Sequence, residues 1–151
     1  MRRNLFISNK RIQKTEIPSL KIKDGNKTYT WSDGRSYIER ANGDKSWCLN
    51  GKYHRVDGPA IEWADGSKSW WLNGNRHRVD GPAIEWVDGT KEWWLNGKLH
   101  RVDGPAREWA DGGKSWFLNG KLHRIDGPAI ERANGDKEWW LNGERQKSIG
   151  V

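Results

Sequence analysis

Apolar and polar positions recur along this chain with a fixed period of 23 residues. The block HRVDGPAIEW begins at His54 and again at His77, and the variants HRVDGPAREW and HRIDGPAIER begin at His100 and His123. Short runs such as AIEW and SWWL lie between Asp-Gly, Asn-Gly and Asp-Gly-Pro turns. Runs of this length between such turns are typical of β-hairpins. The pattern predicts an all-β protein built from tandem repeats.

Two strands and a return loop are expected in each unit. We expect residues 60–64 and 67–72 to form a hairpin and residues 73–81 to form a structured loop to the next one. Three equal strands would reverse the chain direction from one copy to the next, so the copies would not be equivalent. The predicted fold is an elongated antiparallel sheet of β-hairpin repeats, a single-layer solenoid with degenerate end units.

The expected register of the hairpin follows from a two-residue Asp-Gly turn, which places Ile61 opposite Trp70. A three-residue bulged turn would pair Glu62 with Lys68 and mix apolar and polar residues on both faces. We prefer the first register, because a slip of one residue would scatter the apolar set.

This register predicts which side chains meet solvent. Trp71 lies on the face of Glu62 and Ser69, which is the expected solvent side. A single sheet has no second layer, so we expect apolar residues of the return loops, such as Leu99 and Val102, to cover the inner tryptophans.

The repeats and the N-terminus differ in charge. Seven basic residues stand at or before Lys23 against Glu16 alone, whereas the remainder carries 20 basic and 19 acidic residues. We divide the chain into a basic segment outside the repeats, 1–22, and a repeat array, 23–151, which has a degenerate part, 23–53, full units, 54–145, and a cap, 146–151.

Composition argues against several function classes. No apolar run approaches the roughly 20 residues that span a membrane, and the single cysteine, Cys48, suits a reducing cytoplasm. All four histidines occupy one repeat position, and no catalytic or metal-binding set stands out from the repeat. The repeated Arg-x-Asp is expected to be structural, with Asp accepting backbone N–H bonds in its turn and Arg paired to it or to a neighbouring loop. We expect a non-enzymatic protein without cofactor or metal.

The unit resembles a MORN repeat in its 23-residue length, its aromatic strand, its NGK turn, its histidine and its Asp-Gly turn. The resemblance covers Lys23 to about Gly143, but HRVDGP stands where a MORN unit usually has a shorter HGxG segment. The HRxDGPA variant is also similar to uncharacterised repeat proteins of bacteriophages and giant viruses. These resemblances imply a binding or scaffolding role inside an infected cell.

The leading hypothesis is a phage protein that binds and inhibits or redirects a host defence protein in the host cytoplasm. Tryptophan on an exposed face marks interaction sites. Arg107 interrupts a row of isoleucines in the middle of the array, where end-capping does not explain it. The candidate partner-binding residues are therefore Trp71, Trp94, Phe117, Trp140 and Arg107.

Two alternatives stay open. The first is binding of nucleic acid or anionic phospholipid through the aromatic side chains that recur with the repeat and through a basic N-terminal arm. The candidate anion contacts of this arm are Arg2, Arg3, Lys10, Arg11 and Lys14. The second is a structural or scaffold part of a virion. A homodimer formed through a sheet face or an open edge is a further candidate for the partner.

Overall fold

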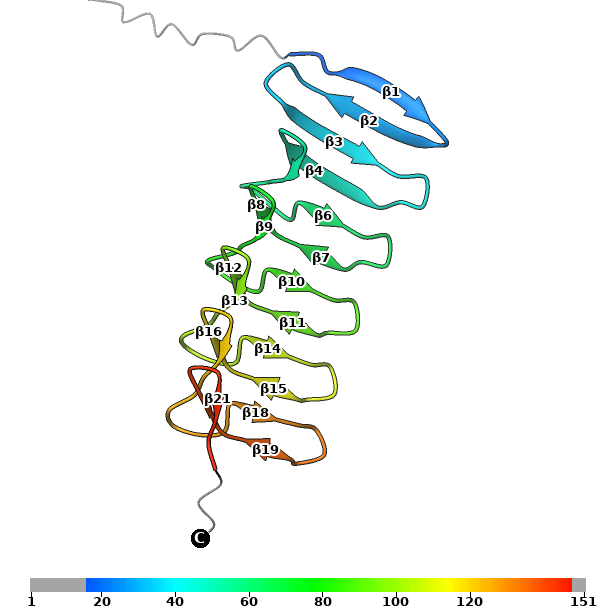
Figure 1. Cartoon of the computed structure of the whole chain (residues 1–151). Coiled ribbons are helices and arrows are strands. Elements are labelled where there is room, and N and C mark those ends of the chain that lie inside the picture. Colours follow the sequence, from blue (N-terminus) through cyan, green and yellow to red (C-terminus); the bar gives the residue numbers. More distant parts are fainter. Residues whose placement is uncertain (1–15, 148–151) are drawn as a thin grey trace, which may run out of the picture.

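A computed structural model describes residues 16–147. It confirms an all-β protein, and no helix occurs in the described part of the chain. Thirteen strands form one long antiparallel sheet that does not close into a barrel. The hairpins stack like rungs from the N-terminal to the C-terminal end, so that the described ends lie at opposite ends of an elongated array (Figure 1).

The N-terminal part contains the longest strands. The first four pair in sequence order as antiparallel neighbours: β1 (Ser19–Lys23), β2 (Asn26–Thr30), β3 (Arg35–Glu39) and β4 (Lys45–Leu49). The short β5 (Lys52–Tyr53) folds back on β4. β1 therefore includes the last four residues of the segment 1–22 that the sequence sets apart.

Each of the four units that follow carries two hairpins. The wide hairpins continue the main sheet: β6 (Ile61–Glu62) with β7 (Lys68–Ser69), β10 (Ile84–Glu85) with β11 (Lys91–Glu92), β14 (Arg107–Glu108) with β15 (Lys114–Ser115), and β18 (Ile130–Glu131) with β19 (Lys137–Glu138). The tight hairpins form separate two-stranded sheets: β8 (Trp71–Leu72) with β9 (Asn75–Arg76), β12 (Trp94–Leu95) with β13 (Lys98–Leu99), β16 (Phe117–Leu118) with β17 (Lys121–Leu122), and β20 (Trp140–Leu141) with β21 (Glu144–Arg145).

The tight hairpin corrects the expectation that residues 73–81 are loop. Asn73 and Gly74 have φ angles of 51° and 83°. Two successive residues with positive φ are characteristic of a type I′ turn, which matches the twist of a two-residue hairpin. The chain therefore turns back at this point, and only residues 77–82 remain as the return loop.

The expected register is also wrong. Ile61 lies opposite Ser69 and Glu62 opposite Lys68, with a three-residue loop between Trp63 and Ser67. Gly66 has a φ of 95°. A turn that ends in a left-handed glycine adds one residue to the loop and shifts the pairing. The shift does not scatter the apolar residues over both faces, because the strand ends before Trp70. From there the chain continues into the tight hairpin, which is a separate sheet.

The two faces of the main sheet differ in character. On the charged face, glutamate and lysine alternate from strand to strand, and each Glu of β6, β10, β14 and β18 lies opposite a Lys on both sides. The opposite, apolar face carries Ile61 and Ile84 beside Ser69, and these side chains are buried. Cross-strand pairs of opposite charge stabilise a sheet on its wet face.

The core is thin and aromatic side chains shield it. Ala60, Ala83, Ala106 and Ala129 are fully buried, one in each unit. The indole N–H of Trp71 donates to the buried Ser69 Oγ at 2.6 Å, so this ring lies against the apolar face of the main sheet. Aromatic rings therefore take the place of a second layer.

Candidate binding surface

The return loops form one long edge of the molecule, and an arginine fixes each loop. In the loop of residues 77–82, Arg78 Nε donates to Asp80 at 2.9 Å, and Nη1 donates to the Pro82 carbonyl at 3.1 Å and to Glu85 at 2.9 Å. The guanidinium lies over Trp70, 4.0 Å from the ring centre. A Cβ at Gly81 would lie 3.0 Å from Arg78 Cζ, so a larger residue there would displace the guanidinium.

The same contacts recur in every loop. Arg55, Arg101 and Arg124 stack on Trp47, Trp93 and Trp116, and they bond Asp57, Asp103 and Asp126. This confirms the structural reading of the Arg-x-Asp motif. Charge-assisted hydrogen bonds of this kind are roughly twice as strong as neutral ones.

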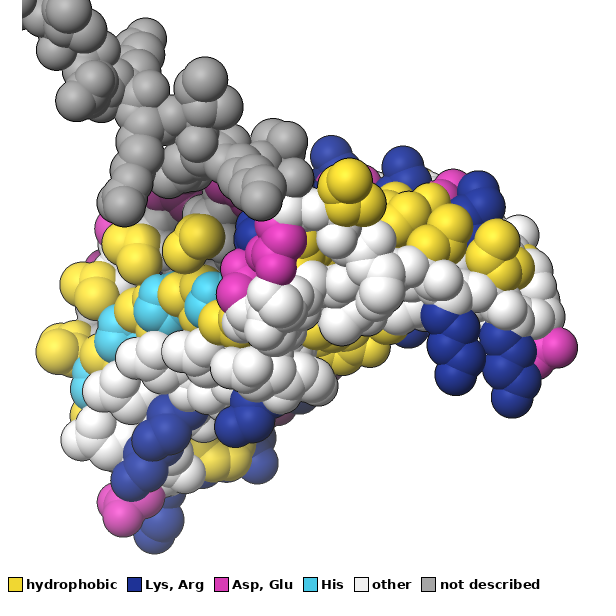
Figure 2. Space-filling view, turned by 90° about the horizontal axis from the view of Figure 1, so that it is seen from above, with side chains coloured by type: hydrophobic (Ala, Val, Ile, Leu, Met, Phe, Trp, Pro, Cys, Tyr) yellow, Lys and Arg dark blue, Asp and Glu magenta, His cyan; other side chains and the backbone are white. Residues whose placement is uncertain are grey.

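The loops are also tied to the tight hairpins. The backbone N–H of Asn96 donates to His77 Nδ1 at 3.2 Å, and Gly97 N–H donates to the Arg76 carbonyl at 2.9 Å. Equivalent bonds join each histidine to the asparagine 19 residues later. The histidines therefore hold successive units together, and they form a row flanked by hydrophobic side chains (Figure 2).

One apolar side chain of each return loop meets solvent almost completely. We call these four residues the loop ridge, and their exposed fractions are 85% for Val56, 83% for Val79, 83% for Val102 and 85% for Ile125. The expectation that these residues cover the tryptophans is wrong, because the stacked arginines occupy that place. Leu99, in contrast, is buried as expected.

A hollow lies between successive loops of the ridge. One hollow, of about 510 Å³, has Val79 and Val102 on its two sides and Trp93 and Leu95 in its lining. The preceding hollow, of about 520 Å³, repeats this arrangement one unit earlier. The edge thus alternates apolar projections with hollows of equal size.

The predicted aromatic line lies inside the array. Trp71, Trp94, Phe117 and Trp140 begin the tight hairpins and are half-buried. The indole N–H groups of Trp94 and Trp140 donate to Glu92 and Glu138, and Arg76 lies over the rings of both Trp71 and Trp94. Among the tryptophans of the described residues, Trp86, Trp109 and Trp139 are the most exposed. A partner contact through the predicted line stays a prediction.

Arg107 has a partner within the sheet. Its Nε lies 3.1 Å from Glu92 Oε1 on the neighbouring strand, although the N–H does not point at that oxygen. Glu92 stands where other units carry Ser69, Ser115 or Glu138, and Glu138 faces Ile130 and pairs with Arg132 instead. The pair of Glu92 and Arg107 therefore gives Arg107 a role inside the sheet. The sequence does show that Glu92 and Arg107 both differ from the residues at their positions in most other units. That the two residues face each other can be recognised only once the strand register is known.

The other candidates are placed as follows. The basic residues Arg2, Arg3, Lys10, Arg11 and Lys14 lie outside the described residues. Within residues 16–147, no three His, Cys, Asp or Glu side chains are grouped so that they could hold a metal ion. The same part of the chain contains no helix long and apolar enough to cross a membrane.

The loop carboxylates titrate abnormally. Arg101 lowers the pKa of Asp103 from its ordinary value of 3.8, first through its side-chain hydrogen bond and then through its charge. Asp57, Asp80 and Asp126 have pKa values lowered by the same causes. These shifts belong to the structural clamps rather than to an acid–base pair, because all four carboxylates have the same surroundings.

Comparison of the sequence with protein-family models found no match, and no curated protein matches it.

Proposed function

We propose that this protein is a non-enzymatic protein-binding repeat module and that the loop ridge binds its partner. The observation that supports this proposal most strongly is the exposure of Val56, Val79, Val102 and Ile125, each above four-fifths, in one row along one edge. A row of exposed apolar side chains on a monomer is typical of a surface that binds another molecule.

The loops meet a second requirement of a binding surface. Each is held by three arginine hydrogen bonds and a stacked indole, as in the loop of Arg78. A surface fixed before binding loses little conformational entropy when the partner arrives. The hollows between the loops, lined by Trp93 and Leu95, offer sites for apolar side chains of the partner.

The proposed partner is a host protein. The resemblance of the HRxDGPA units to repeat proteins of bacteriophages and giant viruses supports a viral protein that acts in the host cytoplasm. In this role the module inhibits or redirects its partner, such as a defence enzyme, by covering part of its surface.

An affinity pull-down from bacterial lysate tests the proposal. The wild-type chain is compared, with and without nuclease, with a Val79→Asp/Val102→Asp variant, which places charges on the ridge. The matched control is Val87→Asp, because Val87 is also exposed, at 66%, but follows β10 at the wide-hairpin turns. Far-UV circular dichroism of each variant establishes that it is folded.

We expect one host protein to be retained after nuclease, to be lost with the ridge variant and to be kept with the control. Partner capture that is equal in all three proteins contradicts a role of the ridge. Capture that disappears with nuclease favours nucleic-acid binding instead.

A further inference from the structure

The wide-hairpin turns, at the edge away from the loop ridge, are joined by a ladder of hydrogen bonds. The first loop residue of each turn donates its backbone N–H to a side-chain oxygen of the preceding hairpin. Ala64 donates to Asp44 at 2.9 Å, Val87 to Ser67 Oγ at 3.0 Å and Ala110 to Thr90 Oγ1 at 3.1 Å. Ala41 donates in the same way to Asn26.

The ladder is interrupted at one step. Gly113 stands where Ser67 and Thr90 supply the hydroxyl. Consequently, the N–H of Ala133, which continues the ladder, has no acceptor among residues 16–147. Backbone N–H groups left unpaired in a folded protein are met by water or by a ligand.

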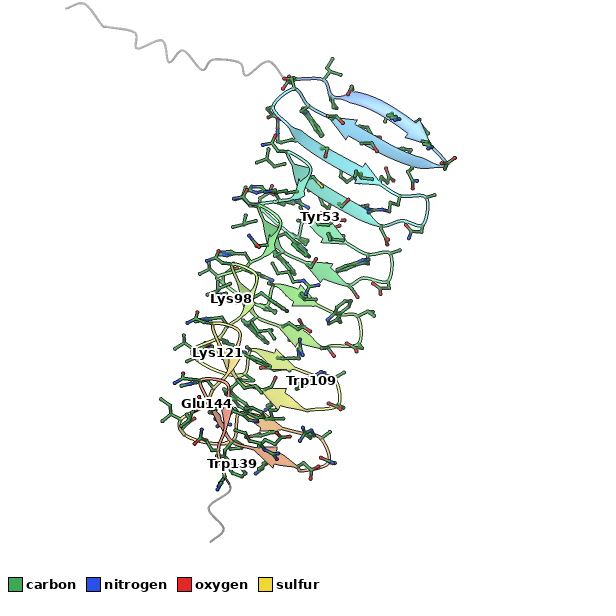
Figure 3. All side chains as sticks on the ribbon, viewed as in Figure 1. Tyr53, Lys98, Trp109, Lys121, Trp139 and Glu144 are labelled. Carbon is green, nitrogen blue, oxygen red and sulfur yellow. The ribbon has the colours of Figure 1, made fainter. Side chains whose placement is uncertain are left out.

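A hollow opens at this interruption. It has a volume of about 530 Å³, similar to that of the hollows beside the loop ridge. Its lining includes Trp109, Asp111, Gly113, Arg132 and Ala133. Figure 3 shows Trp109 after β14, on the side of the wide-hairpin turns and away from the tight hairpins of Lys98, Lys121 and Glu144.

The walls of the hollow differ from those of the step between the first two full units. There, Trp63 and Trp86 stack with ring centres 5.6 Å apart. At the Gly113 step, Arg132 replaces the second tryptophan and pairs with Glu138, so the indole of Trp109 has no ring to stack on there. Trp109 is 37% exposed, about as much as Trp86, and Arg107 lies near its ring, 5.5 Å from the ring centre.

The polar groups of the hollow disfavour an anionic ligand. Arg132 is neutralised by Glu138, and Glu131 by Arg124, so the charge left is that of Asp111. Asp111 accepts the Gly113 N–H through Oδ1, and no described residue donates to its Oδ2. A ligand carboxylate would be repelled by Asp111, whereas a hydroxyl can donate to Asp111 and accept from Ala133.

We propose that this hollow is a binding site for a pyranose sugar. One hydroxyl takes the place of the missing serine hydroxyl at the Ala133 N–H, a neighbouring hydroxyl donates to Asp111, and the apolar C–H face of the ring packs on Trp109. The electron-rich face of an indole favours the partly positive C–H groups of such a ring. The site lies apart from the loop ridge and goes beyond the proposed function, because it needs no protein partner.

Nuclear magnetic resonance of the full chain tests the site. Glucose, galactose, mannose and N-acetylglucosamine are titrated separately, and the Ala133 backbone amide and the Trp109 indole N–H are followed. We expect saturable shifts of both signals with at least one sugar. Gly113→Ser supplies an acceptor that competes with the sugar for the Ala133 N–H, and it weakens that binding at least about tenfold.

Two further variants complete the experiment. Lys68→Ser changes an exposed lysine of the charged face away from this hollow and is expected to leave the affinity unchanged. Trp109→Leu removes the ring face, keeps the Ala133 N–H and is expected to weaken binding. The proposal is overturned if no sugar moves the Ala133 signal, if sodium acetate moves it and sugars do not, or if Gly113→Ser binds sugar as the wild type does.

Discussion

At the scale of single residues, departures from the repeat explain one another. Glu92, like Glu138, introduces a carboxylate where Ser69 and Ser115 stand, and its side chain is only 12% exposed. A poorly hydrated carboxylate needs a cation or hydrogen-bond donors. Arg107 on one side and the Trp94 indole N–H on the other provide them.

Replacement of Arg107 by isoleucine, the residue of the other units, is therefore expected to destabilise the protein. The free energy of unfolding should fall by about 1–3 kcal/mol, because Glu92 loses its cation. The double variant Glu92→Ser/Arg107→Ile recreates the pairing of Ile84 with Ser69 and should recover most of this loss. Urea unfolding followed by tryptophan fluorescence measures both, and a single variant as stable as the wild type would contradict the pairing.

Gly113 provides a second residue-scale prediction. Gly113→Ser supplies an acceptor for the Ala133 N–H and should raise the free energy of unfolding by about 0.5–1.5 kcal/mol. Its Cβ would lie 3.2 Å from Trp109 Cε3, so the ring must move slightly. Gly113→Ala keeps this contact without the hydroxyl and is the control; equal unfolding midpoints for the two variants in urea would rule out the hydrogen bond.

At the scale of elements, each unit depends on two turns of different length. The Asn96-Gly97 turn closes the tight hairpin with φ angles of 49° and 78°, and the wide hairpin needs a left-handed glycine at Gly89, with a φ of 94°. A side chain with a Cβ is strained in this conformation. These glycines separate the two hairpins of a unit and so place the return loop between them.

Gly97→Ala tests the tight turn. It should lower the free energy of unfolding by about 1–2 kcal/mol, because alanine disfavours a φ of 78°. Lys98→Ala, at the adjacent exposed position, should change it little. Guanidinium unfolding followed by circular dichroism compares the variants, and equal stability of both would argue against a strained turn at this position.

At the scale of the whole molecule, each unit contacts mainly its neighbours in the array. The stability of such an array is approximately a sum over units and their interfaces. Removal of one internal unit should therefore leave a shorter array of the same fold, provided that the new interface resembles the old one.

Deletion of residues 54–76 meets this condition. It joins Tyr53 to His77, places Ser46 opposite Ile84 as Ser69 is now, and keeps the pair of Glu92 and Arg107. We expect a folded protein whose denaturant m-value is lower by about a sixth. An unfolded product, or an unchanged m-value, would show that the units are not interchangeable.

The four Arg–Asp clamps make the stability of the whole array sensitive to acid. The pKa values of four carboxyls are lowered in the folded state, those of Asp57, Asp80, Asp103 and Asp126. Their contribution to the stability of the fold is therefore present above pH 3.8, and it is lost as the pH falls through their folded-state pKa values. Thermal unfolding by circular dichroism should give a midpoint that is steady above about pH 5 and declines below about pH 4. Replacement of all four by asparagine should lower the midpoint at neutral pH and make the acid decline shallower; an unchanged slope would contradict this origin.

The sequence by itself determined the repeat, the all-β class and the places where the chain turns. These features are local: the φ requirements of Asp65-Gly66 and Asn73-Gly74 fix the turns wherever the unit lies. The structural use of Arg78 and Asp80 was also predictable, because the two charges recur at a fixed spacing beside a turn.

Only the tertiary structure decided the register, the second hairpin and which apolar rows meet solvent. Val79 is exposed because Arg78 lies over the ring of Trp70 in its place. Trp71 is half-buried because its indole N–H donates to the buried Ser69. The sequence pattern marks both residues as apolar and does not contain these contacts. Burial is set by what packs on a side chain from elsewhere, and that information arises only when the units are stacked.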